Sequence, residues 1–250
     1  MKVGLFIPCY VDLFYPNVGI ATLSLLEKQG VKAEYPTQQT CCGQPMANSG
    51  YEHLTYGCDH NFIQNFKNYD YIVAPSGSCV LHVKEHLKGE TPQEEALAQY
   101  IKTHIYELVE FLTDVLKVKS IQASFPHKVG FHQSCHALRG LRLASMSERT
   151  EPSFSKPHQL LAQVKDLELT PINRPDECCG FGGTFCVQEE AVSVKMGKDK
   201  VKDHESNGAE YISGCDMSCL MHLDGILKRN NSPMKIIHIA EILNQENTLS

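Results

Sequence analysis

The tripeptide Cys-Cys-Gly occurs twice in the sequence, at residues 41–43 and 178–180, and a distant cysteine both precedes and follows each copy. This pattern defines two four-cysteine sets: the first set is Cys9, Cys41, Cys42 and Cys79, and the second set is Cys135, Cys178, Cys179 and Cys219. Four thiols are the ligands that an iron-sulfur cluster or a structural zinc ion requires. The spacing therefore predicts two similar metal centres.

The sequence around the cysteines is repeated as well. Three pairs of segments match in the same order along the chain: 2–9 with 128–135, 78–82 with 218–222, and 104–108 with 238–242. Self-similarity over half a chain indicates two copies of one structural unit. We therefore predict a boundary near residue 118, between a first half of residues 1–118 and a second half of residues 119–250.

Short apolar runs alternate with helical patterns in both halves. We expect strands at 2–8, 31–35, 71–74, 128–133, 209–213 and 235–238. We expect helices at 17–30, with Asn17 as the N-cap, and at 48–66, 189–206 and 217–229. This alternation predicts an α/β fold in which each half is a mainly parallel sheet flanked by helices, with the cysteine loops at the carboxyl ends of the strands.

A further helix is expected after the capping sequence Thr91-Pro92-Gln93-Glu94, which has proline at the first helical position. Apolar residues then recur at helical spacing, at positions 97, 101, 105, 108, 112 and 115. The pattern predicts one long helix whose apolar face packs in the core.

Composition excludes some classes of function. The chain has 23 basic and 29 acidic residues, a formal charge of -6, and no run rich in lysine or arginine. Nucleic acid is therefore not an expected partner, because binding phosphates needs a basic face. No stretch approaches the roughly 18 apolar residues of a membrane span, and the opening lacks the features of a signal peptide. We expect a cytoplasmic protein without a membrane span.

A cytoplasmic location changes the interpretation of the 11 cysteines. Thiols stay reduced in that compartment, so metal binding explains the two sets better than disulfides do. Cys58 and Cys186 belong to neither set and are expected to be small buried apolar residues. Cys215 lies four residues before Cys219 but has no counterpart in the first half, so we do not expect it to be a ligand.

Adjacent cysteines suit some metal sites better than others. Neighbouring side chains diverge along an extended backbone, which favours a wide iron-sulfur cluster over a small closed zinc site. Gly43 and Gly180 permit a positive φ and let backbone amides approach the cluster. The glycines at 180–183 do not have the spacing of a nucleotide-binding loop.

Five segments join cysteines to characteristic neighbours or lie between them: 41–45 (Cys-Cys-Gly-Gln-Pro), 48–51 (Asn-Ser-Gly-Tyr), 75–79 (Pro-Ser-Gly-Ser-Cys), 178–185 (Cys-Cys-Gly-Phe-Gly-Gly-Thr-Phe) and 218–221 (Ser-Cys-Leu-Met). Over nearly the whole chain they resemble the Cys-Cys-Gly family of iron-sulfur proteins, which includes the cysteine-rich component of heterodisulfide reductase and the iron-sulfur subunits of glycolate oxidase and anaerobic glycerol-3-phosphate dehydrogenase. The resemblance is strongest to the lactate-utilisation members. It implies an iron-sulfur subunit of a three-protein complex that oxidises L-lactate to pyruvate, with the other subunits as partners.

The chain departs from the wider family at one point. The cysteine-rich component of heterodisulfide reductase supplies five cysteines per repeat, ending in Cys-x-x-Cys, and uses them for noncubane clusters. Cys79 and Cys219 lack that second cysteine. We therefore expect one ordinary 4Fe-4S cluster per repeat, on the four cysteines of each set, with zinc in one repeat as the alternative.

Several basic residues near the cysteines each have two possible interpretations. His82 and His222 follow Cys79 and Cys219 at Cys-x-x-His spacing, so each is either a ligand or proton relay or a surface or capping residue. His136 has the same two interpretations. Arg139 and Arg142 either bind a carboxylate or balance the charge of a cluster, or are solvated helix residues.

Three functions are consistent with these features. The first is an electron-transfer subunit in the lactate-oxidising complex. The second is a catalytic cluster subunit that acts on another 2-hydroxy acid or on a disulfide, and the third is a structural zinc protein that holds partners together. The sequence shows no flavin or nicotinamide fingerprint to accept two electrons. We therefore expect the chain alone to oxidise little or no lactate.

Overall fold

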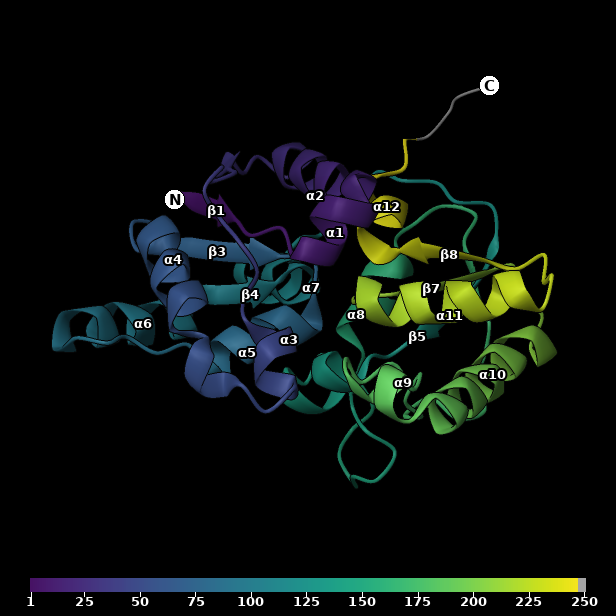
Figure 1. The fold of residues 1–250 in the computed structure, drawn as a ribbon. Helices are drawn as coiled ribbons and strands as arrows, with labels where there is room; N and C mark the ends of the chain where they lie inside the picture. Colours follow the sequence, from purple (N-terminus) through teal and green to yellow (C-terminus); the bar gives the residue numbers. More distant parts are fainter. Residues whose placement is uncertain (247–250) are drawn as a thin grey trace.

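The computed structural model describes residues 1–246, which form two four-stranded sheets whose strands are all parallel (Figure 1). The first sheet has the strand order β2-β1-β3-β4 and the second has the order β6-β5-β7-β8. The strands of the first are β1 (Val3–Leu5), β2 (Ala33–Glu34), β3 (Tyr71–Ala74) and β4 (Ile105–Glu107). Those of the second are β5 (Lys128–His132), β6 (Glu168–Leu169), β7 (Tyr211–Gly214) and β8 (Lys235–His238). The predicted α/β class is confirmed, with the same strand order in both halves.

Helices connect the strands and cover the sheets (Figure 1). Those of the first half are α1 (Cys9–Phe14), α2 (Pro16–Lys28), α3 (Gln44–Asn48), η1 (Glu52–Leu54), α4 (Tyr56–Phe66), α5 (Gly77–His86), α6 (Pro92–His104), α7 (Leu108–Glu110) and the π-helical turn η2 (Phe111–Val115). Those of the second half are the π-helical turn η3 (His136–Gly140), α8 (Lys156–Leu161), α9 (Phe185–Gln188), α10 (Glu190–Ser206), α11 (Met217–Arg229) and α12 (Ile239–Asn244). None of the helices within residues 1–246 is long and apolar enough to cross a bilayer.

The central strands are buried on both faces. Val3 and Leu5 of β1 belong to a large apolar cluster that extends into the second half, whereas Phe6, just beyond the strand, packs in a separate cluster with α4, α5 and α6. Parallel sheets covered on both sides need such continuous apolar runs. The first sheet therefore has helices on both faces.

The long helix expected up to residue 115 does not exist as one element. Helix α6 ends at His104, and residues 105–107 form β4, which pairs with β3. Glu107 then caps α7, because its carboxylate accepts hydrogen bonds from the N–H groups of Val109 (2.6 Å) and Glu110 (3.3 Å). Apolar spacing alone cannot distinguish a short buried strand from a helical turn, so Ile105 fitted both patterns.

The same strand corrects the register of the repeat. Ala74 pairs with Glu107 in the first sheet and Gly214 pairs with His238 in the second. His238 also caps a helix, since its Nδ1 accepts the N–H of Ala240. Glu107 is therefore the structural counterpart of His238, and the sequence match of 104–108 with 238–242 is wrong by three residues.

Three smaller expectations also change. Helix α2 begins at Pro16 rather than after an Asn17 cap, because proline fits the first helical position. The helix expected at 48–66 is divided into α3, η1 and α4. The strand β6 has only two residues, too few to leave a sequence pattern.

The two halves meet at the ends of β3 and β7. Ser76 and Asp216, which hold equivalent positions, form an antiparallel bridge with each other. The N–H of Gly77 donates to the carbonyl of Cys215 (3.2 Å), and the N–H of Ser78 donates to the carboxylate of Asp216 (2.7 Å). A bridge between equivalent residues places an approximate two-fold axis at this point. Helix α12 packs on α2, so the apolar core continues across the axis.

Candidate metal centres

Each set of cysteines gathers at the carboxyl ends of its strands, as predicted. Cys9 begins α1, which follows β1 after residues 6–8, and Cys79 lies in the first turn of α5 after β3. Cys219 lies in the first turn of α11 after β7, and Cys135 precedes η3. The Cys-Cys-Gly loops enter from the neighbouring strands β2 and β6. This edge is where open α/β sheets form their sites.

In the first set the sulfur atoms form a connected row. Cys9 Sγ lies 3.7 Å from Cys41 Sγ, and Cys42 contacts both Cys41 and Cys79. The thiols of Cys42 and Cys9 donate hydrogen bonds to Cys41, which lowers the pKa of Cys41 to about 2. Donation to Cys41 in turn raises the pKa of Cys9 and of buried Cys42. Cys41 is therefore the member of this row whose pKa its neighbours lower.

The second set repeats that arrangement. The thiols of Cys135 and Cys179 donate to Cys178 and lower its pKa to about 2. Cys179 also contacts Cys219. In addition, the N–H of Gly180 points at Cys178 Sγ (3.3 Å) and the N–H of Phe181 at Cys179 Sγ (3.5 Å). Such N–H groups stabilise thiolates, which are the form that binds metal.

The glycine of each tripeptide makes the loop possible. Gly43 has a φ of 89° and Gly180 a φ of 90°, a left-handed conformation that favours glycine. The turn directs both cysteines of the pair toward the framing cysteines of their set. The expected positive φ is confirmed at both positions.

The sulfur atoms of each set do not form a closed tetrahedral zinc site. In a tetrahedral site with Zn–S bonds of about 2.3 Å, every pair of sulfurs is about 3.8 Å apart. Among residues 1–246, the one group of three or more candidate ligands whose donor atoms all lie within 4.8 Å of one another is His132, Cys179 and Cys219. No three sulfurs of either set are that close. The thiols of each set therefore form an open row rather than a closed site.

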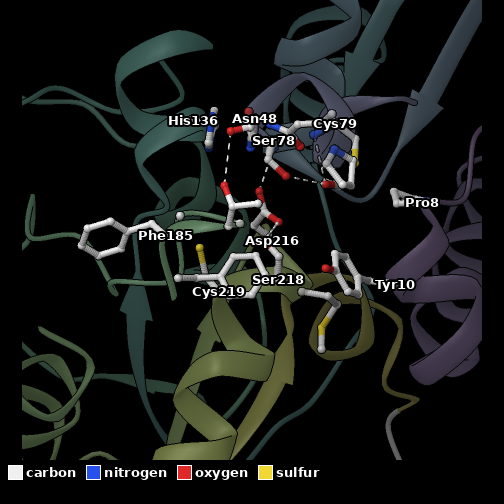
Figure 2. Close-up of a pocket in the computed structure, with 18 of the residues that line it drawn as sticks. Pro8, Tyr10, Asn48, Ser78, Cys79, His136, Phe185, Asp216, Ser218 and Cys219 are labelled. Atoms are coloured by element: carbon white, nitrogen blue, oxygen red, sulfur yellow. Dashed lines mark hydrogen bonds between the residues drawn. The ribbon is translucent and has the colours of Figure 1, made fainter. Parts of the chain in front are cut away.

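Both sets face a single cavity of about 640 Å³ between the halves (Figure 2). All eight cysteines line it. Figure 2 shows Asp216 in this cavity, between the backbone N–H of Ser78 and the hydroxyl of Ser218, which donates to the carboxylate at 2.8 Å. The two centres therefore share one space across the two-fold axis.

The walls of the cavity carry few charges. No lysine or arginine lines it, and His136 is its one basic side chain within the described part of the chain. Tyr10 and Phe181 pack edge to face on one side, and Phe185 lies nearby. Arg139 is exposed and pairs with Glu148 at 2.7 Å. Of the two interpretations of Arg139, this geometry supports the solvated residue rather than a carboxylate-binding one.

Arg142 is also exposed, has a positive φ of 53° and does not line the cavity. His82 and His222 lie behind the cysteine loops, against the backbone of Cys42 and Cys179 respectively. Burial lowers the pKa of His82 to about 4, so this imidazole is neutral. Both histidines therefore support the loops from behind.

The cysteines outside the two sets have other surroundings. The thiol of Cys186 donates to the carbonyl of Gly183 (3.0 Å), and Cys58 is half-buried on α4 behind Gly43. Cys215 is 1% exposed, and its carbonyl takes part in the contact between the halves. None of the three lines the cavity.

His132 is a residue that the sequence interpretation missed. It ends β5, it is buried, and one ring nitrogen lies within 4.8 Å of two sulfurs of the second set. The repeat contained a signal for it, because His132 aligns with Phe6 in an otherwise apolar strand. A polar residue at a buried position of only one copy marks a difference between the two centres.

Comparison with known proteins defines the class. The model of the family "CCG: Cysteine-rich domain" matches residues 3–84 and 129–224, one copy in each half. Lactate utilization protein A of Bacillus pumilus is 42% identical over 246 residues, which are 98% of this chain and 99% of the relative. Lactate utilization protein A of Geobacillus kaustophilus is 41% identical over 99% of this chain and 100% of the relative. The chain belongs to the lactate utilization protein A family.

A solved structure shows the same fold. A hypothetical protein from Helicobacter pylori superposes with a TM-score of 0.63 at 13% identity, over 97% of this chain. The chain spans 48% of the length of that protein. At this level of identity the likeness concerns the fold alone.

Proposed function

We propose that the chain is the iron-sulfur subunit of a cytoplasmic complex that oxidises L-lactate to pyruvate, and that it relays electrons between the other lactate-utilisation subunits and an acceptor. Each half would hold one cluster, of the 4Fe-4S type, on its four cysteines. The observation that carries the proposal is the shared cavity, which brings all eight cysteines to one space. Two centres that face each other are arranged for transfer of electrons between them.

The residues would supply different parts of this role. The cysteines would hold the clusters, which when bound accept and donate single electrons. The N–H groups of Gly180 and Phe181 point at sulfurs of the second set and would stabilise its negative charge. Tyr10 and Phe181 would limit the access of water on one side of the cavity.

The cavity favours relay over catalysis on an acid. A carboxylate substrate is usually held by arginine or lysine, and neither lines this cavity among the described residues. Asp216 would instead repel an anion there. Oxidation of lactate also needs a two-electron acceptor, which the sequence does not provide. We therefore assign lactate oxidation itself to a partner subunit.

The test is to purify the chain without air and to measure iron, acid-labile sulfide and the electron paramagnetic resonance spectrum. We expect a brown protein with two clusters. The variant pair Cys178→Ser and Cys42→Ser should each lose one cluster signal, whereas Cys58→Ser, a cysteine outside both sets, should lose none. A colourless protein that binds zinc in both halves would contradict the proposal and favour a structural role.

A second measurement separates relay from catalysis. The chain alone should not convert lactate to pyruvate with an artificial acceptor, and conversion should begin when the partner proteins are added. Sustained turnover by the isolated chain would refute the relay assignment and favour the catalytic one. Reduction of the clusters by lactate only in the presence of the partner proteins would support the relay assignment.

A further inference from the structure

His132 is buried without a polar partner. Its side chain is 1% exposed, and neither ring nitrogen makes a hydrogen bond within residues 1–246. An unpaired polar group in the interior costs about 1–3 kcal/mol, so nearly all such groups find a partner. The ring nitrogens of His132 are therefore available to a ligand that is not a group of the described chain.

The imidazole faces the second set. One ring nitrogen, Cys179 Sγ and Cys219 Sγ all lie within 4.8 Å of one another. The position follows from the sheet, because β5 pairs with β7 and places His132 beside Gly214, just before the loop that leads to Cys219. The nitrogen therefore points at the sulfurs that would bind the metal.

The polar neighbours of His132 do not satisfy it. Lys200 is fully buried, but its Nζ donates to the carbonyl of Arg174 at 2.6 Å. His204 is fully buried too, and both of its ring nitrogens are unpaired within residues 1–246. No polar group of the described chain is therefore a hydrogen-bond partner of the His132 ring nitrogens.

The first half shows that packing does not require a histidine here. The counterpart of His132 is Phe6, which is fully buried and packs edge to face on Phe62 (4.9 Å) and Phe66 (5.8 Å). An apolar ring fills this position of the fold without any unpaired atom. The imidazole in the second half is thus less favourable for packing and needs a different explanation.

We propose that His132 binds the metal centre of the second half through a ring nitrogen, together with thiols of the second set that include Cys179 and Cys219. The inference rests on the proposed function, since it assumes a metal centre in that half. Neutral imidazole is a good ligand for iron and for zinc. The first half has Phe6 at this position and offers sulfur donors alone, so the two centres differ in chemistry.

The test uses the full chain, purified without air and labelled with ¹⁵N-histidine. Pulsed electron paramagnetic resonance of the reduced protein should show a nitrogen coupling of the size seen for directly bound imidazole, and the label should change it. The coupling should be lost in His132→Phe, which restores the residue of the first half. The matched control His222→Phe, which changes a histidine that lies against the backbone of the same loop, should keep it.

The outcomes separate this inference from the proposed function. Two clusters in the unaltered chain without a bound-nitrogen coupling would overturn the role of His132 and leave the function standing. A nitrogen coupling that survives His132→Phe but disappears in His222→Phe would identify His222 as the ligand. This result would also overturn the role of His132. The labelling result on the unaltered chain decides whether a histidine binds, even if His132→Phe does not fold.

A chain without iron would contradict the proposed function but would still test His132. If zinc is bound, replacement by cobalt should give the ligand-field spectrum of a site with sulfur and nitrogen donors. His132→Phe should convert this spectrum to that of sulfur donors alone. An unchanged cobalt spectrum, or a chain that binds no metal, would overturn the inference.

Discussion

Replacement of Gly180 by alanine should destabilise the chain by about 2–5 kcal/mol. Gly180 has a φ of 90°, and a left-handed residue with a side chain costs about 1–2 kcal/mol. A β-carbon here would also lie 2.6 Å from the carbonyl oxygen of Ser193 and 2.9 Å from Cβ of Met196, both on α10. Backbone cannot yield as a flexible side chain does, and overpacking of this kind costs about 1–3 kcal/mol more.

The assay is urea unfolding of the anaerobic protein, with iron measured in the same samples. Gly208→Ala is the matched control, because Gly208 has a φ of 76° but nothing lies within 4 Å of its added carbon. This control should lose only about 1–2 kcal/mol and no iron. Gly180→Ala should lose more stability and the iron of the second half. Equal losses in both variants would refute the argument that α10 fixes the cysteine loop.

Three other predictions follow from buried groups. Burial holds the pKa of His238 at about 4, below its ordinary 6.5, so between these values the unfolded chain binds a proton that the folded chain does not. The contribution of His238 to stability should be complete above about pH 6.5 and fall by about 3 kcal/mol on acidification to about pH 4. His238→Asn, which keeps a capping acceptor, should remove that part of the pH dependence in unfolding titrations. Asp216→Ala should cost about 1–3 kcal/mol in urea unfolding, because it leaves the buried N–H of Ser78 unpaired, and a neutral result would show that this contact between the halves is dispensable. In a redox titration the second-half centre should be reduced at the higher potential, because a buried imidazole lies beside its sulfurs, and His132→Phe should lower that potential. Identical midpoints for the two centres would contradict this.

The sequence correctly predicted several strands and helices whose apolar pattern is clear. The strands at 71–74 and 235–238 and the helix at 217–229 have the expected bounds. It failed where two structures share one pattern, as at Ile105, whose apolar spacing continues a helix although the residue starts a strand. Only pairing with β3, a long-range contact, decides between them. The register of the repeat at Glu107 failed for the same reason.

The candidate site was easier to predict than its surroundings. Adjacent thiols before glycine have few uses in a core, so spacing alone identified the residues that the fold brings together. The roles of Arg139 and His82 depended on side-chain direction, which spacing does not give. His132 was missed because a histidine in an apolar run looks like an ordinary strand residue until its unpaired nitrogens are seen.

The two halves are copies of one unit, so their cysteines match. The residues packed next to those cysteines differ between the halves. Most of the first set lies in one cluster with the aromatic rings of Phe6, Phe62 and Phe66, whereas the second set has the buried imidazole of His132 beside it. Reduction adds negative charge to a cluster, and an apolar surrounding disfavours added charge more than a polar one does. The first-half centre should therefore be the poorer electron acceptor. In the relay that we propose, that difference would give transfer across the shared cavity a direction, from the first half to the second.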